Sequence, residues 1–116
     1  MNDNDFSAAV SERRFGGIAR LYGADALNRF AAAHVCVVGV GGVGSWAVEA
    51  LARSGIGALT LIDLDNVAES NVNRQLHALT CDFGKAKVTA LHERIHQINP
   101  AFPVTELQDI DTEDTL

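Results

Sequence analysis

Three glycines in the first half of the chain have the spacing of a phosphate-binding turn. Gly39, Gly41 and Gly44 satisfy the pattern G-x-G-x-x-G and directly follow an apolar run. In such a turn the first glycine allows a tight bend, the second lets the backbone approach phosphate, and the third lets the next helix pack on the strand. Backbone N–H groups at the start of that helix, with its positive dipole end, would face the anion. The alternative is a glycine-rich turn needed only for packing.

Two acidic residues follow the next apolar run. Asp63 comes about twenty residues after the glycine turn, where a carboxylate can accept hydrogen bonds from ribose hydroxyls. Asp65 would lie on the same side of an extended chain, where it could bind magnesium or cap the next turn. These residues fit a nicotinamide-dependent dehydrogenase and an ATP-using enzyme equally well.

Two cationic side chains distinguish these classes. Arg74 lies just beyond Asp63, and Lys87 opens a predicted helix. A dinucleotide enzyme has little need for an arginine and a lysine converging on the phosphate turn. An enzyme that splits a triphosphate must neutralise charge on the phosphoryl group that is transferred. The pair therefore favours ATP.

The elements that must position these residues form a βαβ unit. Residues 34–40 are a continuous apolar run, typical of a central parallel strand buried on both faces. Residues 45–53 predict a helix ended by Ser54 and Gly55, and residues 58–63 predict a second buried strand. Strand, glycine turn, helix and strand over about thirty residues make a βαβ unit.

The rest of the chain extends this unit. We expect helical residues around 10–14, broken by Gly16 and Gly17, a helix over 25–32, irregular structure over 65–81, a helix over 85–99 and a strand over 102–107. The predicted fold is α/β and Rossmann-like, three layers around a mostly parallel sheet. Because three strands bury little, we expect residues 1–116 to be the N-terminal, ATP-binding part of a larger domain, or to pair with another copy.

Composition limits the class of protein. The 116 residues are 47% hydrophobic and 21% charged, which is ordinary for one globular domain. No apolar run is long enough to cross a bilayer, the N-terminus is too acidic for a signal peptide, and two cysteines make neither a disulfide framework nor a zinc site. Cytoplasm is the expected compartment. Five of the fifteen acids lie in residues 106–116, so the remaining chain is nearly neutral and a nucleic-acid partner would need a local basic patch.

Four motifs, in this order, carry a family resemblance: GVGGVGS at 39–45, LIDLD at 61–65, SNVNRQ at 70–75 and GKAK at 84–87. They resemble the ATP site of the E1-like superfamily, which contains ubiquitin-activating enzymes and the ThiF, MoeB and HesA adenylyltransferases. Residues 13–23 and 97–100 resemble a narrower branch, the tRNA threonylcarbamoyladenosine dehydratases. The resemblance implies ATP-dependent activation of a carboxylate on a modified adenosine of tRNA, followed by ring closure. The alternatives are adenylation of a sulfur-carrier protein's C-terminus, an NAD-binding oxidoreductase, and a non-catalytic scaffold.

The resemblance also implies roles for single residues. Asp63 would hold the ribose, Asn71 and Arg74 the phosphates, and Lys87 the departing pyrophosphate. Arg14, or Arg13 in its place, would reach the ATP of a partner subunit in a homodimer. The implied catalytic residues are Arg14, Arg74 and Lys87, and the implied nucleotide-binding residues are Gly39, Gly41, Gly42, Gly44, Asp63, Asp65, Asn71, Arg74, Gln75 and Lys87. The implied cofactors are ATP and Mg²⁺, and the implied partners are tRNA and a sulfur-transfer protein. The magnesium aspartate and covalent cysteine of the family have no counterpart before Leu116, so no metal ligand is assigned.

Other residues have simpler interpretations. His92 and His96 fit the zinc-protease pattern H-E-x-x-H, but that helix already packs on the sheet and no third ligand is evident. We expect Cys36 to be a small core residue, Trp46 to pack rather than stack on a base, and His77 to be a solvated loop histidine rather than part of the ATP site.

Overall fold

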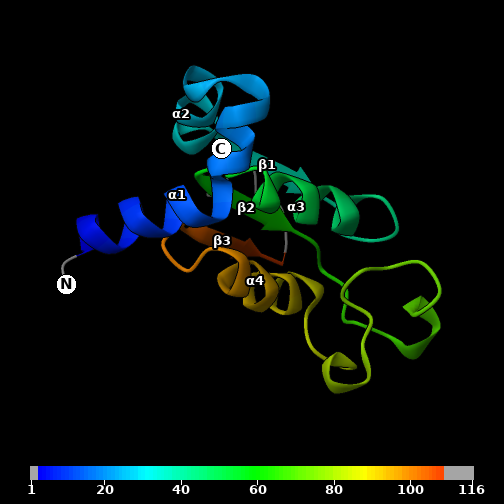
Figure 1. Cartoon of the computed structure of the whole chain (residues 1–116). Helices are drawn as coiled ribbons and strands as arrows, with labels where there is room; N and C mark the ends of the chain where they lie inside the picture. The colour runs from blue at the N-terminus through cyan, green and yellow to red at the C-terminus, as the bar shows by residue number, and fades with distance from the viewer. Residues whose placement is uncertain (1–2, 109–116) are drawn as a thin grey trace, which may run out of the picture.

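The computed structural model of the chain describes residues 3–108, with side chains from residue 13 onward. Its elements, in order, are α1 (Asp3–Tyr22), α2 (Ala24–Ala32), β1 (His34–Val38), α3 (Gly44–Arg53), β2 (Ala58–Ile62), the 3₁₀ turns η1 (Glu69–Asn71) and η2 (Thr80–Asp82), α4 (Lys87–Ile98) and β3 (Val104–Leu107). Figure 1 shows the crossover between β2 and α4 projecting from the sheet as a long, mostly irregular connection. Every predicted strand and the predicted helices over 25–32, 45–53 and 85–99 are therefore confirmed, with ends shifted by a few residues.

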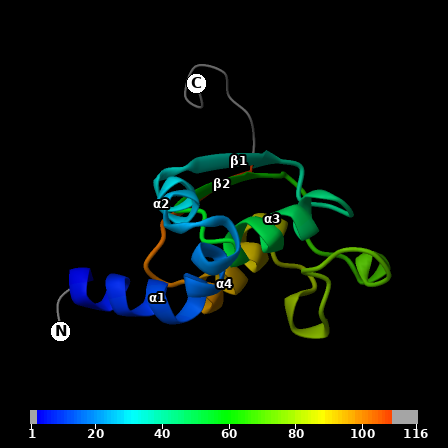
Figure 2. The same ribbon diagram turned by 45° about the horizontal axis from the view of Figure 1, so that its top comes forward.

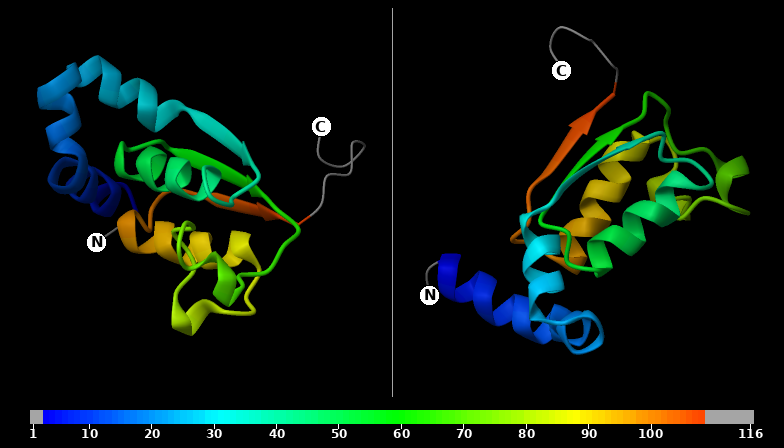
Figure 3. Two further views of the ribbon diagram at one scale, coloured as in Figure 1. Left: turned by 90° about the vertical axis from the view of Figure 1, so that its right-hand side faces the viewer. Right: turned by 90° about the horizontal axis from the view of Figure 1, so that it is seen from above.

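The three strands form one parallel sheet in the order β1-β2-β3. Helices α3 and α4 lie on one face of it, as two views show (Figures 2 and 3). Parallel strands require crossovers, and here α3 and α4 supply them, which confirms the predicted Rossmann-like α/β fold. The carboxyl ends of β1 and β2 lie side by side because Val38 pairs with Ile62.

The position of β1 differs from the prediction. It is an edge strand of the described sheet rather than a central one, and its side chains alternate between exposed and half-buried. Val38 is 63% exposed, and Cys36 is exposed rather than part of the core. The prediction for Cys36 was wrong, because an apolar run shows that a strand can be buried on both faces, but not which neighbours cover it. Within the described residues, α3 and α4 cover only the face of the sheet opposite to Cys36 and Val38.

Helix α1 also differs from the prediction. It runs through Gly16 and Gly17 and ends before Gly23, which has a positive φ of 94°. Two glycines weaken a helix by roughly 1 kcal/mol each relative to alanine, but tertiary packing can outweigh that cost. Phe15 supplies such packing, since it is buried and stacks on Phe102 with 6.1 Å between ring centroids.

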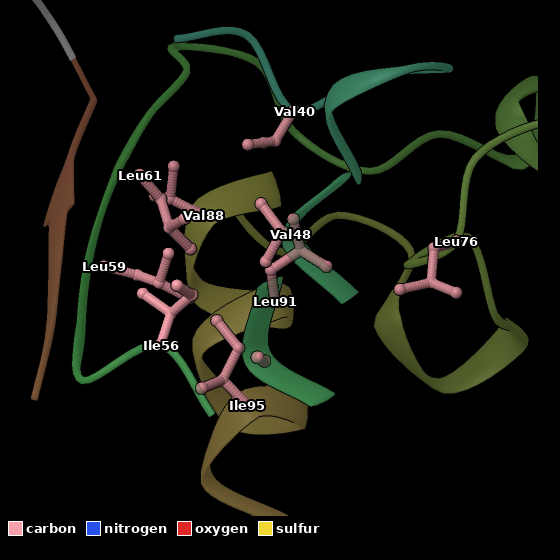
Figure 4. Packing of buried hydrophobic residues seen from close by; sticks show 10 residues of the cluster. Val40, Val48, Ile56, Leu59, Leu61, Leu76, Val88, Leu91 and Ile95 are labelled. Atoms are coloured by element: carbon pink, nitrogen blue, oxygen red, sulfur yellow. The ribbon is translucent and has the colours of Figure 1, made fainter. Parts of the chain in front are cut away.

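The main core lies between β2 and the two helices beneath it. Leu59 and Leu61 of β2 point at Val48 of α3 and at Leu91 and Val88 of α4 (Figure 4). All five are almost fully buried. Burying each such side chain contributes about 1.5–3 kcal/mol, so this layer holds the carboxyl edge of the sheet in place.

Within residues 3–108, no helix is both long and apolar enough to cross a membrane. Most of the acidic stretch singled out in the sequence, from Asp109 onward, lies outside the described residues.

Candidate nucleotide-binding site

The glycine turn lies at the carboxyl end of β1 and leads directly into α3. Gly39 has a φ of +83°, a backbone conformation that residues with side chains rarely adopt. At Gly44 an added Cβ would lie 1.8 Å from the carbonyl oxygen of Gly39, so no side chain fits there. The first and third glycines thus have the structural roles expected from the sequence. Gly41 and Gly42 have more room, since an added Cβ would meet only the side chains of Gln75 and Arg74, at 3.6 and 3.9 Å.

Asp63 is anchored beside this turn by two backbone groups. Its Oδ2 accepts a hydrogen bond from the Val40 N–H at 2.9 Å, and its Oδ1 accepts one from the Asp65 N–H at 2.8 Å. A carboxylate has about four acceptor positions, so both oxygens can still accept hydrogen bonds from ribose hydroxyls. The arrangement fits the predicted role of Asp63 and also explains how the glycine turn is tied to β2.

Lys87 and Asp65 form a pair at the start of α4. Lys87 is 7% exposed, and its Nζ lies 3.9 Å from the Asp65 Oδ2. The Lys87 N–H also donates to the Asp65 carbonyl oxygen at 3.0 Å. The Asp65 side chain is 64% exposed, so its carboxylate faces both the lysine and solvent. Asp65 therefore presents an oxygen ligand of the kind that Mg²⁺ takes alongside phosphates.

Arg74 lies against the glycine turn, as its predicted role requires. A Cβ at Gly42 would sit 3.9 Å from the Arg74 Cγ. The Arg74 Nη1 donates to the Ser70 carbonyl and to the Asn73 Oδ1 at 3.1 and 3.0 Å. These are exposed contacts, so the guanidinium keeps further donors for a phosphate.

Asn71 and Gln75, which precede and follow Arg74 in the sequence, are both buried, each about 8% exposed. The Asn71 Oδ1 accepts the Ala68 N–H at 2.9 Å, which leaves its Nδ2 group as the part that can donate to a ligand. The Gln75 Nε2 lies 3.6 Å from where a Gly41 Cβ would be. The Asn71 side chain thus braces the crossover segment, and the Gln75 side chain contacts the glycine turn.

Ser45 and Trp46, at the start of α3, fasten the crossover segment to the turn. The Ser45 hydroxyl donates to the Gly41 carbonyl and accepts the Leu76 N–H at 3.2 Å. The Trp46 Nε1–H donates to the Arg74 carbonyl at 2.9 Å, while its ring stays about half exposed. From the sequence, Ser45 had no expected role and Trp46 was expected only to pack. The only sign in the sequence of the role of Ser45 was its position directly after Gly44, at the end of the glycine turn.

His77 is not the solvated histidine that the sequence predicted. It is 3% exposed, and its Nε2 lies 2.8 Å from the Val40 carbonyl oxygen. Burial lowers the pKa of His77, the hydrogen bond to Val40 opposes this, and the nearby charge of Lys87 lowers the pKa further. The imidazole is therefore held neutral beneath the glycine turn.

Arg14 lies far from the glycine turn of its own chain. Its Nη1 donates to the carbonyl oxygens of Ile98 and Gln97, at 2.7 and 3.3 Å, at the C-terminal end of α4. A cation at this end of a helix satisfies carbonyls that lack a helical partner. The side chain of the adjacent Arg13 is exposed. A role of either residue at a partner's site stays a prediction.

The residues of the H-E-x-x-H pattern make other contacts. The His92 Nδ1 lies 2.6 Å from the Glu106 Oε2, and Glu93 pairs with Lys85 at 2.8 Å. No group of three or more potential metal-binding side chains occurs within the described part of the chain. Lys85 and Glu93 instead border an open groove of about 740 Å³ between α1, α3, α4 and the crossover; His77 lines this groove, but none of the glycines of the turn does.

Comparison with known proteins agrees with this geometry. The model of the ThiF family matches residues 16–115 of the chain. The chain belongs to the ThiF family. It is 61% identical, over 104 residues, to the tRNA threonylcarbamoyladenosine dehydratase of Escherichia coli K12, covering 90% of this chain and 39% of that protein. It is 34% identical over 108 residues to the sulfur carrier protein ThiS adenylyltransferase of the same organism, covering 93% of this chain and 41% of that protein.

A solved structure also has a fold similar to that of this ThiF-family chain. The crystal structure of the E. coli tRNA N6-threonylcarbamoyladenosine dehydratase TcdA in complex with ATP superposes with a TM-score of 0.84 at 61% identity, covering 89% of this chain and 42% of that one. The ThiF-family chain thus spans about two fifths of the length of the proteins it matches.

Proposed function

We propose that this chain is the N-terminal, ATP-binding portion of a tRNA threonylcarbamoyladenosine dehydratase. The observation that supports it best is the arrangement at the carboxyl edge of the sheet, where Asp63 and Arg74 lie against the glycine turn and Lys87 is paired with Asp65. This set supplies a ribose acceptor and two cations around a phosphate-binding backbone, which suits a triphosphate that is cleaved. The similarity to the dehydratase, at 61% identity against 34% for the carrier-protein adenylyltransferase, favours the tRNA substrate.

In the proposed reaction a carboxylate oxygen of the modified nucleoside attacks the α-phosphorus of ATP. The bond from that phosphorus to the bridging oxygen breaks, and pyrophosphate leaves. Arg74, Lys87 and the N–H groups of the turn stabilise the charge that develops. An internal atom of the nucleoside then attacks the activated carboxyl carbon, AMP leaves, and the ring closes with net loss of water.

Two further components belong to this proposal. Mg²⁺ would neutralise phosphate charge, and Asp65 is the described residue placed to hold it. In a homodimer, a second copy would supply an arginine to the phosphates. Arg14 would first have to leave the carbonyls of α4, whereas the exposed Arg13 would not.

Calorimetry with ATP and with NAD tests the nucleotide. We expect saturable ATP binding and at most weak NAD binding; tight NAD binding without ATP binding would instead favour an oxidoreductase. Release of AMP and pyrophosphate, measured with modified tRNA and separately with a sulfur-carrier protein, tests the acceptor. Turnover with the carrier protein and none with modified tRNA would exclude the dehydratase and support the adenylyltransferase.

A further inference from the structure

Two adjacent peptide groups of the glycine turn are each held by one buried or half-buried side chain. The N–H of the Gly39–Val40 peptide donates to Asp63 at 2.9 Å. The carbonyl of the Val40–Gly41 peptide faces His77 at 2.8 Å. Val40 itself is fully buried, so water does not compete for either group. The sequence pointed to Asp63 as a ligand contact but gave His77 no role in the turn.

The contact fixes the protonation of the imidazole. A carbonyl oxygen can only accept a hydrogen bond, so the His77 Nε2 carries the hydrogen and donates it. In the neutral ring the Nδ1 is then the unprotonated nitrogen. That atom is buried and has no hydrogen-bond partner among the described residues, which agrees with a neutral ring.

The contact also fixes the direction of the Gly41 N–H. In a planar trans peptide the C=O and the following N–H point in opposite directions. Because the Val40 carbonyl points inward to His77, the Gly41 N–H points to the outer side of the turn, where phosphate would approach. A flipped peptide would present a carbonyl oxygen to phosphate, and the glycine at position 41 makes such a flip easy.

We propose that His77 is a positioning residue of the phosphate site: its Nε2–H holds the Val40–Gly41 peptide in the orientation that presents the Gly41 N–H to a nucleotide phosphate. The proposal rests on the ATP-binding function proposed above. It makes His77 the counterpart of Asp63, which holds the preceding peptide.

Two neutral amide substitutions separate this role from simple packing. In His77→Gln the side-chain amide nitrogen can take the place of Nε2 and donate to the Val40 carbonyl. In His77→Asn the side chain is one carbon shorter and cannot reach it. We expect the glutamine variant to bind ATP within about threefold of the parent and the asparagine variant to bind about tenfold more weakly, as for the loss of one hydrogen bond. Thermal unfolding of both variants reports any general loss of packing.

The inference and the proposed function fail in different ways. A parent chain that does not bind ATP contradicts the proposed function, whatever His77 does. A parent that binds ATP, with folded glutamine and asparagine variants that bind it equally well, overturns the inference. Nitrogen-15 NMR of the parent imidazole gives a test that needs no variant: the inference expects a neutral ring protonated at Nε2, and a ring protonated at Nδ1 would overturn it. The Gly41 amide signal should also shift when ATP is added to the parent.

Discussion

Replacing Gly44 by alanine tests whether the glycine turn is as tightly packed as the structure shows. The added Cβ would lie 1.8 Å from the Gly39 carbonyl oxygen and 2.9 Å from its carbon, so backbone atoms would have to move. The backbone at Gly39 cannot move cheaply, because the Gly39 N–H donates a hydrogen bond to the Ile62 carbonyl oxygen at 2.8 Å and the Val40 N–H is held by Asp63. Overpacking costs about 1–3 kcal/mol, and a lost hydrogen bond of the turn adds about 1 kcal/mol.

We therefore expect Gly44→Ala to lower the free energy of unfolding by about 3 kcal/mol, which for a chain of this size lowers Tm by roughly 12 °C. Gly42→Ala is the matched control. Its Cβ would meet only the Arg74 side chain at 3.9 Å, an ordinary contact, and Gly42 has no positive φ. We expect it to change the free energy of unfolding by no more than about 0.5 kcal/mol.

Urea unfolding followed by circular dichroism gives both free energies and their m-values. A Gly44→Ala chain within about 0.5 kcal/mol of the parent, with an unchanged m-value, would refute the packing argument. Equal losses in both variants would show that the turn tolerates no side chain at all, and the distances at Gly44 would then not be the cause.

Two further predictions concern charged residues. Lys87→Met keeps the buried alkyl chain but removes the charge, so we expect the affinity for ATP, measured by calorimetry, to fall about ten- to a hundredfold. The control Lys85→Met loses only contacts to Asp82 and Glu93 and should leave the affinity unchanged. Equal losses of affinity in both variants would contradict the role of Lys87 in the site. The hydrogen bonds of Arg94, outweighing burial, lower the pKa of Glu49 in the folded chain. This pair therefore stabilises the fold above the ordinary glutamate pKa, and the stabilisation is lost as pH falls through the lowered pKa. Glu49→Gln should flatten the acid limb of a plot of stability against pH, and an unchanged acid limb would show that the pair contributes nothing there.

Much of the site could be predicted because its residues follow the strands directly. Gly39 and Asp63 come at the ends of β1 and β2, and parallel strands bring such residues to one edge of a sheet. The expected roles of Arg74 and Lys87 depended on the family resemblance as well, because the long crossover from β2 to α4, which contains Arg74, has no periodic pattern. The structure places Arg74 against the turn and Lys87 beside Asp65, although their roles in binding are still predictions.

The parts that could not be predicted depend on contacts between distant residues. His77 is polar and lies in an irregular segment, so nothing local shows that it is buried under Val40. The same holds for Arg14, whose hydrogen bond to the Ile98 carbonyl spans 84 positions of the chain. Burial of a polar side chain depends on what packs over it, and a single sequence does not contain that information.

The sequence by itself determined the parallel α/β fold, the glycine turn and the acid that follows the second strand. These features depend on local rules: strand periodicity, the backbone freedom of glycine and the order of the elements. The tertiary structure decided the rest. It carried α1 through two glycines, buried His77 beneath the glycine turn, and set the direction of the Gly41 N–H through that histidine. Each of these outcomes follows from packing and hydrogen bonds between segments far apart in the chain, where the gain from contact outweighs local preference.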